Sequence, residues 1–119
     1  LKNASLSVNT IALKTVYSGA FVILQAGQKR FAFHDTDFIF HMAEDYVAKN
    51  MNFNAKMYME AAWQLLLIDA RQFLIFTEHG KPISEIARLF KSNAKISSKK
   101  ALELNLIDGI LPKSKIPKI

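Results

Sequence analysis

The sequence predicts a layered α/β domain with largely parallel strand pairing. Short apolar segments alternate with helical segments along the chain, which predicts this class. Gly and Pro are few and 50% of the residues are hydrophobic, which indicates a globular unit. A chain of 119 residues with this composition fits one compact unit that can bury a core. We expect residues 1–111 to form this single domain and residues 112–119, which carry Pro and Lys, to form a flexible tail.

Four short segments are expected to be strands, because each is apolar or rich in β-branched residues. They are residues 8–16, 30–33, 38–41 and 106–111, the last with a bend at Gly109. Four other segments are expected to be helices: residues 18–26, 54–79, 84–90 and 99–104. Gly27 and Gly80 stop the first two helices. Ser97 and Ser98 cap the last one.

The helix expected over residues 54–79 is amphipathic. Its apolar residues broadly follow helical spacing: Met57, Ala61, Leu65, Ile68, Phe73 and Phe76. Three methionines and a tryptophan on or near this helix suit either a protein core or an interface between copies: Met51, Met57, Met59 and Trp63. We favour the core for these four side chains.

Composition argues against several classes of protein. The net charge of +6 does not indicate nucleic-acid binding, because the basic residues are dispersed and no aromatic residues interleave with them. Cys is absent, which excludes disulfides and thiolate metal sites and makes a reducing cytoplasm the default location. No apolar run is long enough to span a bilayer. No metal or organic cofactor is implied.

The stretch over residues 15–24 is the first candidate for chemistry, because an apolar strand leads into a serine, two small residues and a helix. A serine at such a turn has its hydroxyl at a helix N-terminus, where backbone N–H groups can stabilise an oxyanion. On this motif alone, a simple N-cap role for Ser18 is the better interpretation.

Five segments in order resemble the proteolytic subunit of the Clp protease (ClpP) and the signal peptide peptidase SppA, within the crotonase-like group. They are Tyr-Ser-Gly-Ala-Phe at 17–21, Lys-Arg-Phe-Ala at 29–32, Phe-Ile-Phe-His at 38–41, the helix break at 79–86, and Ala-Leu-Glu-Leu-Asn-Leu-Ile-Asp-Gly-Ile-Leu at 101–111. The resemblance implies a ClpP/crotonase-like α/β fold with a long handle-type helix. The family has further βα units and a glycine-rich loop upstream of these segments. The resemblance therefore also implies that the chain corresponds to the C-terminal two-thirds of the family's fold.

The family uses a serine nucleophile, a histidine base and an acidic residue that orients the histidine. The resemblance puts Ser18 at the nucleophile in the SppA pattern, His41 at the base and Gly19 at the oxyanion donor. In the ClpP pattern Tyr17 would instead occupy the serine position; we favour Ser18.

The acidic position departs from the family pattern. Asn93 falls where ClpP has aspartate, and asparagine can orient a histidine without offsetting its positive charge. Asp35, Asp37 or Asp108 could substitute, although all three are more simply interpreted as turn residues.

The resemblance implies a serine-type endopeptidase that hydrolyses extended polypeptides, with an ATP-dependent unfoldase as a candidate partner. The alternative is a non-catalytic ClpP-like subunit that acts in oligomer assembly. A homo-oligomer is expected in both cases. A crotonase-type acyl-CoA enzyme is a distant third, because Ser18 and His41 have no ready role in one.

Overall fold

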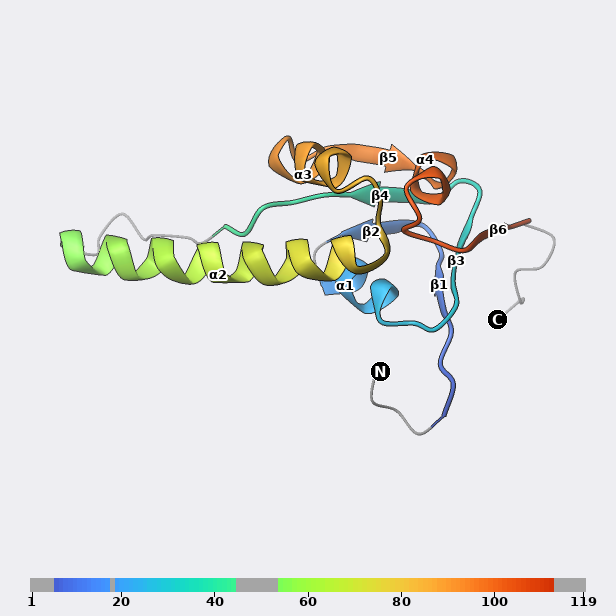
Figure 1. Cartoon of the computed structure of the whole chain (residues 1–119), viewed down its shortest axis with the longest axis horizontal. Helices are drawn as coiled ribbons and strands as arrows, with labels where there is room; N and C mark the ends of the chain where they lie inside the picture. Colours follow the sequence, from blue (N-terminus) through green and yellow to red (C-terminus); the bar gives the residue numbers. More distant parts are fainter. Residues whose placement is uncertain (1–5, 18, 45–53, 113–119) are drawn as a thin grey trace.

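Within the residues that a computed structural model describes, six strands and four helices follow one another in mixed order (Figure 1). The structure describes residues 6–17, 19–44 and 54–112. In order the elements are β1 (Thr10–Ala12), β2 (Thr15–Tyr17), α1 (Gly19–Gln25), β3 (Arg30–Phe33), β4 (Asp37–Ile39), α2 (Ala55–His79), α3 (Ile83–Lys91), β5 (Lys95–Ser97), α4 (Ser98–Glu103) and β6 (Gly109–Leu111). The predicted mixed α/β class is confirmed at this level.

The strands form two small sheets of three strands each. The first has the order β1-β3-β6 and is parallel throughout. The second has the order β2-β4-β5, in which β2 and β4 are parallel and β4 and β5 are antiparallel. The prediction of largely parallel pairing therefore holds for three of the four strand pairs.

The single strand predicted over residues 8–16 is wrong. The chain turns between β1 and β2, and the two strands join different sheets. The carbonyl of Ala12 accepts a hydrogen bond from the Thr36 hydroxyl (3.1 Å), and the carbonyl of Lys14 accepts one from the Asp37 N–H (2.8 Å). The first bond goes to the link between β3 and β4 and the second to the first residue of β4, and they hold the chain at the point where it passes from one sheet to the other.

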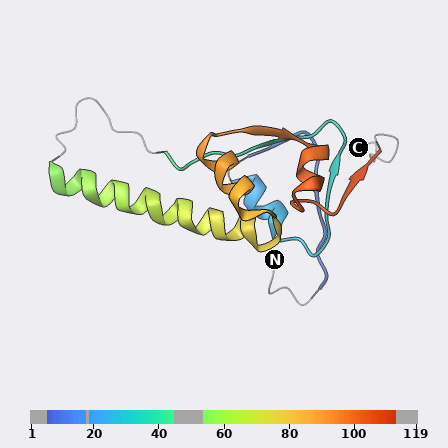
Figure 2. The same cartoon turned by 45° about the horizontal axis from the view of Figure 1, so that its top comes forward.

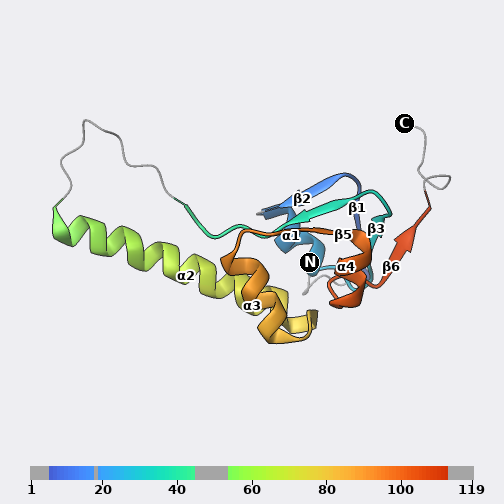
Figure 3. The same cartoon turned by 90° about the horizontal axis from the view of Figure 1, so that it is seen from above.

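Aromatic rings fill the core between the sheets and the helices. Phe21 of α1 contacts Phe40 at 5.2 Å and Phe76 of α2 at 4.6 Å between ring centroids. Thirteen further buried apolar side chains belong to the same cluster, among them Phe38, Ile86, Ala101, Leu106 and Ile107. The C-terminal end of α2 thus packs into the core, whereas the rest of the helix extends away from it (Figures 2 and 3).

Helix α2 begins and ends where the sequence predicts. Asn54 caps its N-terminus by accepting a hydrogen bond from Met57 N–H (2.9 Å). Gly80 ends it in a confined position, because an added Cβ would lie 2.5 Å from the Phe76 carbonyl oxygen and 2.8 Å from Leu106 Cδ2. The expected core role is wrong for Met59 and Trp63, which are 73% and 63% exposed.

Met57 is half-buried, and Met51 lies outside the described residues. Phe76 is the buried residue of this helix. Amphipathic spacing did not separate a core face from an exposed apolar face, because the helix carries apolar residues on both.

The remaining elements match the prediction closely, apart from β5 and the last strand. Of the strand predicted over residues 106–111 only Gly109–Leu111 (β6) forms, and Gly109 is its first residue instead of a bend within it. Helix α3 lies within a residue of its predicted bounds, and Ser97 caps α4 by accepting from Lys100 N–H (3.2 Å). Ser98 has a different role from the predicted cap: it is buried, and its hydroxyl donates to the Phe33 carbonyl (2.6 Å). The sequence does not predict strand β5, because a segment of three residues between two helices is too short to show the alternation of apolar and polar residues that is typical of a strand. No helix in the described part is long and apolar enough to cross a membrane.

Candidate functional site

The ends of β2 and β4 bring two of the candidate residues to one cavity. These strands are parallel, with Tyr17 opposite Ile39, so their carboxyl ends meet at the same edge of the sheet. Tyr17 is the last residue of β2, and His41 follows β4 by two residues. Both line a cavity of about 340 Å³, which Met42, Ala43, Glu44, Ile68 and Gln72 complete.

His41 is partly exposed in this cavity. Its side chain is 40% exposed, and its Nε2 lies 3.5 Å from Glu44 Oε1. Because Glu44 is itself 74% exposed, solvent screens the pair and it contributes little to stability. A histidine beside an open cavity can accept and donate protons. The sequence interpretation did not single out Glu44, although its spacing of three residues from His41 was a visible signal.

Asn93 lies next to the segment that carries His41. It occupies the turn between α3 and β5 with a φ of 51°, a left-handed conformation that asparagine tolerates. Its Oδ1 accepts a hydrogen bond from Met42 N–H (3.0 Å), and the neighbouring Ala94 carbonyl accepts one from Phe40 N–H (2.9 Å). The amide oxygen is thus bound to the backbone one residue beyond His41, and the His41 ring pairs with Glu44 instead.

Asp69 of α2 fixes the same segment from the other side. Its Oδ1 accepts a hydrogen bond from Ala43 N–H (2.7 Å). Two side chains from separate elements therefore hold consecutive amides directly after His41. The role of Asp69 was missed, because nothing in a helical pattern shows which polar residue will meet a loop.

The nucleophile turn is only partly described. Ser18 lies outside the described residues, so its predicted role as nucleophile stays a prediction. Gly19 is the first residue of α1 and is exposed; a Cβ added there would meet nothing within 4 Å. The predicted oxyanion role of its N–H also stays a prediction. Of the turn over residues 17–19, Tyr17 lines the cavity beside His41.

The three aspartates considered as substitutes have other surroundings. Asp108 binds Arg30: its Oδ1 lies 3.2 Å from Arg30 Nη2, and its Oδ2 accepts from the Arg30 backbone N–H at 2.8 Å. The interpretation of Asp108 as a turn residue alone therefore needs correction. Asp37 opens β4 and lies 4.0 Å from Lys95 Nζ, and Asp35 is in the turn between β3 and β4.

Within residues 6–17, 19–44 and 54–112, no three histidine or carboxylate side chains come together as a metal site would require. The polar side chains that line the cavity at the β2–β4 edge are those of Tyr17, His41, Glu44 and Gln72. Comparison of the chain with family models and with curated proteins finds no match.

Proposed function

We propose that this chain is a non-catalytic ClpP-like subunit that acts in oligomer assembly in the cytoplasm. The observation that carries the proposal is an exposed apolar stripe along α2, made of Met59, Trp63, Leu66, Leu67 and Leu74. Spacings of four, seven, eight and fifteen residues from the first member place all five on one side of a helix.

The stripe is large and open to solvent. Its members are between 40% and 73% exposed, although each is a large apolar side chain. Contiguous exposed apolar surface of this kind marks an interaction site in most soluble proteins. Lys56 and Glu60 lie along the same part of the helix, 4.0 Å apart, and supply the polar border that such interfaces carry.

The surroundings of His41 support the non-catalytic part of the proposal. The cavity wall facing this residue carries the bulky Tyr17 side chain, and the position expected to hold a carboxylate carries Asn93, whose Oδ1 accepts from Met42 N–H. Aspartate-to-asparagine replacement in a serine-protease triad costs about 10⁴-fold in turnover. A site with these substitutions would hydrolyse peptides slowly or not at all.

Sedimentation velocity of the full chain tests the assembly proposal. We expect the wild type to self-associate and Trp63→Glu to shift it to a smaller species, because a carboxylate in an apolar interface is left unpaired. Leu102→Glu is the matched control: it places the same charge at a partly exposed leucine on α4 and should leave the oligomer intact. A wild type that stays monomeric, or one that Trp63→Glu leaves unchanged, would overturn the proposal.

A serine-type endopeptidase of the ClpP/SppA type remains the second candidate. The observation that favours it is the position of His41 beside a cavity, with Asn93 hydrogen-bonded to the backbone N–H of the next residue, Met42. In that case Ser18 would attack the peptide carbonyl, His41 would act as base and then acid, Asn93 would orient it, and Gly19 N–H would face the oxyanion. Its substrates would be extended polypeptides, and its partner an ATP-dependent unfoldase.

A fluorophosphonate probe separates the two candidates. The non-catalytic proposal expects no covalent adduct on the intact oligomer by mass spectrometry. An adduct that Ser18→Ala abolishes would establish an activated serine and replace the first proposal by the second.

A further inference from the structure

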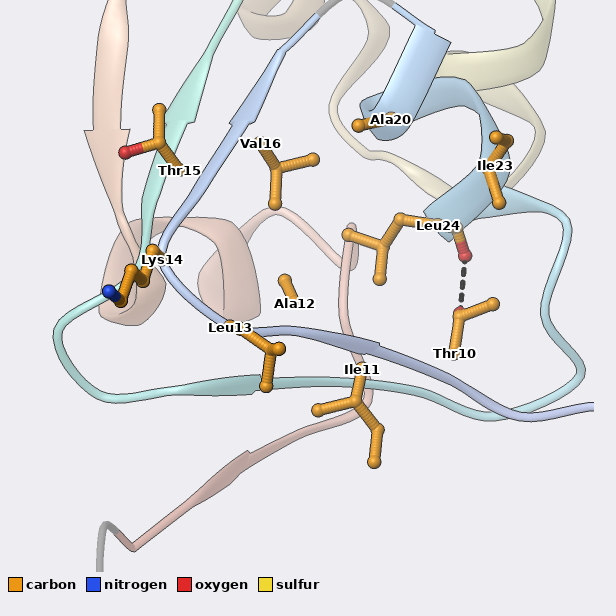
Figure 4. Close-up of a pocket in the computed structure, with 10 residues that line it drawn as sticks. All are labelled: Thr10, Ile11, Ala12, Leu13, Lys14, Thr15, Val16, Ala20, Ile23 and Leu24. Carbon is orange, nitrogen blue, oxygen red and sulfur yellow. Dashed lines mark hydrogen bonds between the residues drawn. The ribbon is translucent and has the colours of Figure 1, made fainter. Parts of the chain in front are cut away.

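A second cavity, distinct from the one beside His41, runs along the outer edge of β1 and β2. Its volume is about 450 Å³, and its lining comes from β1, β2, the link between them, and α1 (Figure 4). Ala12, Val16 and Leu24 are buried, while Ile11, Leu13 and Ile23 are more than half exposed. We name this the edge groove.

The backbone beside the edge groove is available for further pairing. β1 and β2 are each the outermost strand of their sheet, so within the described part of the chain no strand runs along their outer edges. Thr10 N–H donates to the Lys29 carbonyl (2.9 Å), and successive residues of a strand direct their backbone groups to opposite edges. The N–H and C=O of Ile11 therefore face outward.

The same argument applies to β2. The Lys14 carbonyl accepts from Asp37 N–H (2.8 Å), which directs Lys14 toward β4 and the backbone groups of Thr15 to the outer edge. Parallel sheets are normally covered and their edges blunted or paired. Here two consecutive edges stand beside exposed apolar side chains.

We propose that the edge groove binds an extended segment of another polypeptide, which adds to the free strand edges. Main-chain hydrogen bonds to an exposed edge with pockets for alternate side chains are how added strands are recognised. Two features specify the chemistry of the segment. The lining is apolar except for Thr10, Lys14 and Thr15. An added strand turns alternate side chains toward this lining, so the segment carries apolar residues at alternate positions and a carboxylate that can pair with Lys14, the one charged side chain there. This inference does not depend on the assembly role of α2.

Fluorescence polarisation with the full chain tests the proposal. The probe is a short peptide, blocked at both ends, of alternating valine and threonine with one glutamate and a fluorescein label. We expect saturable binding that is lost when alternate residues of the peptide are N-methylated, because methylation removes the hydrogen-bond donors. Amide exchange at Ile11 and Thr15 should slow when the peptide is bound.

Variants locate the binding surface. Leu13→Glu and Ile23→Glu place carboxylates on exposed rims of the edge groove, and each should weaken binding by about tenfold or more. Leu102→Glu should bind as the wild type does. No saturable binding, equal binding of the methylated peptide, or loss of affinity in Leu102→Glu alone would overturn the proposal. So would a change of oligomer size in Leu13→Glu without a change in peptide affinity, because that result would assign the edge groove to a second copy of the chain.

Discussion

Arg30 shows how one buried charge ties three elements together. This side chain is 4% exposed, and its guanidinium donates to Asp108, to Gln25 Oε1 (3.1 Å) and to the Leu106 carbonyl (3.2 Å). Gln25 in turn donates from Nε2 to the same carbonyl (2.8 Å). The network joins β3, the end of α1 and the loop before β6, and every buried polar atom in it is satisfied, as burial requires.

Replacing Asp108 by asparagine should destabilise the fold. Asp108→Asn removes the charge that offsets the buried Arg30 guanidinium. Because Asp108 itself is 37% exposed and Arg30 keeps its bonds to Gln25 and Leu106, we expect a loss of about 1–2 kcal/mol of unfolding free energy. Urea denaturation measures the change. Glu60→Gln, which breaks an exposed pair with Lys56, is the control and should change stability by less than about 0.5 kcal/mol. Equal effects of the two substitutions would contradict the role of the network.

The same carboxyl predicts a pH dependence. Burial by itself raises the pKa of the Asp108 carboxyl. Hydrogen bonds from the Arg30 backbone and side chain, together with the positive charges of Arg30 and Lys29, lower the pKa by more. The net result is a pKa below the ordinary value of an aspartate. A carboxyl with a lowered pKa in the folded state stabilises the fold above its unfolded pKa of about 3.9 and loses that contribution as the pH falls through the folded value. The stability difference between wild type and Asp108→Asn should therefore shrink below about pH 4. A difference that stays constant in urea titrations across this range would refute the argument.

At the scale of elements, we expect opposite effects on stability when alanine replaces the glycine at the start of α1 (Gly19) and the glycine at the end of α2 (Gly80). Gly80→Ala should destabilise the protein by about 1–3 kcal/mol, because its Cβ would meet the Phe76 carbonyl oxygen and Leu106 in a packed core. Gly19→Ala meets open space at the start of α1 and should be neutral or stabilising by up to about 1 kcal/mol. Thermal unfolding of both variants tests this, and a larger loss in Gly19→Ala would show that the packing argument is wrong.

Asn93 predicts a local effect on the segment after His41. Asn93→Gly keeps a residue that tolerates the positive φ and deletes the Oδ1 that accepts from Met42 N–H. We expect faster amide exchange at Met42, while Ala43, held by Asp69, changes less. Exchange followed by NMR reports each amide separately, and unchanged protection at Met42 would mean that the hydrogen bond does not hold the segment.

The helices and their limits follow from sequence better than the strands do. Asn54, Gly80 and Ser97 stand at the ends of helices as their chemistry predicts, because capping is a local property. The division of residues 8–16 between two sheets depends on bonds to Thr36 and Asp37 twenty or more residues away. No local pattern contains that information.

The candidate site follows the same rule. Sequence resemblance selected His41 and Asn93, which the structure places on adjoining segments. Asp69 and Gln72 were missed, because their part in the site depends on how α2 lies against the segment after β4. Glu44 was missed although its spacing of three residues from His41 is local. The Arg30–Asp108 pair was also missed, since 78 residues separate its members.

At the scale of the whole molecule, the apolar stripe lies on α2, whereas the edge groove is lined by β1, β2 and α1. Figure 1 shows that most of α2 projects away from those elements. Substitutions at sites that share no partners act independently. Trp63→Glu should therefore reduce self-association and leave affinity for the valine–threonine peptide unchanged, while Leu13→Glu should do the reverse. The double variant should show both losses, each of the size seen alone.

Sedimentation velocity and fluorescence polarisation on the same four proteins measure both properties. If Trp63→Glu also weakens peptide binding, the peptide is recognised by the oligomer and not by the single chain. That result would mean that self-association through α2 is required for peptide binding at the edge groove. Independent losses would instead describe a subunit that assembles through a projecting helix and receives an extended segment of another polypeptide at the edges of its two sheets.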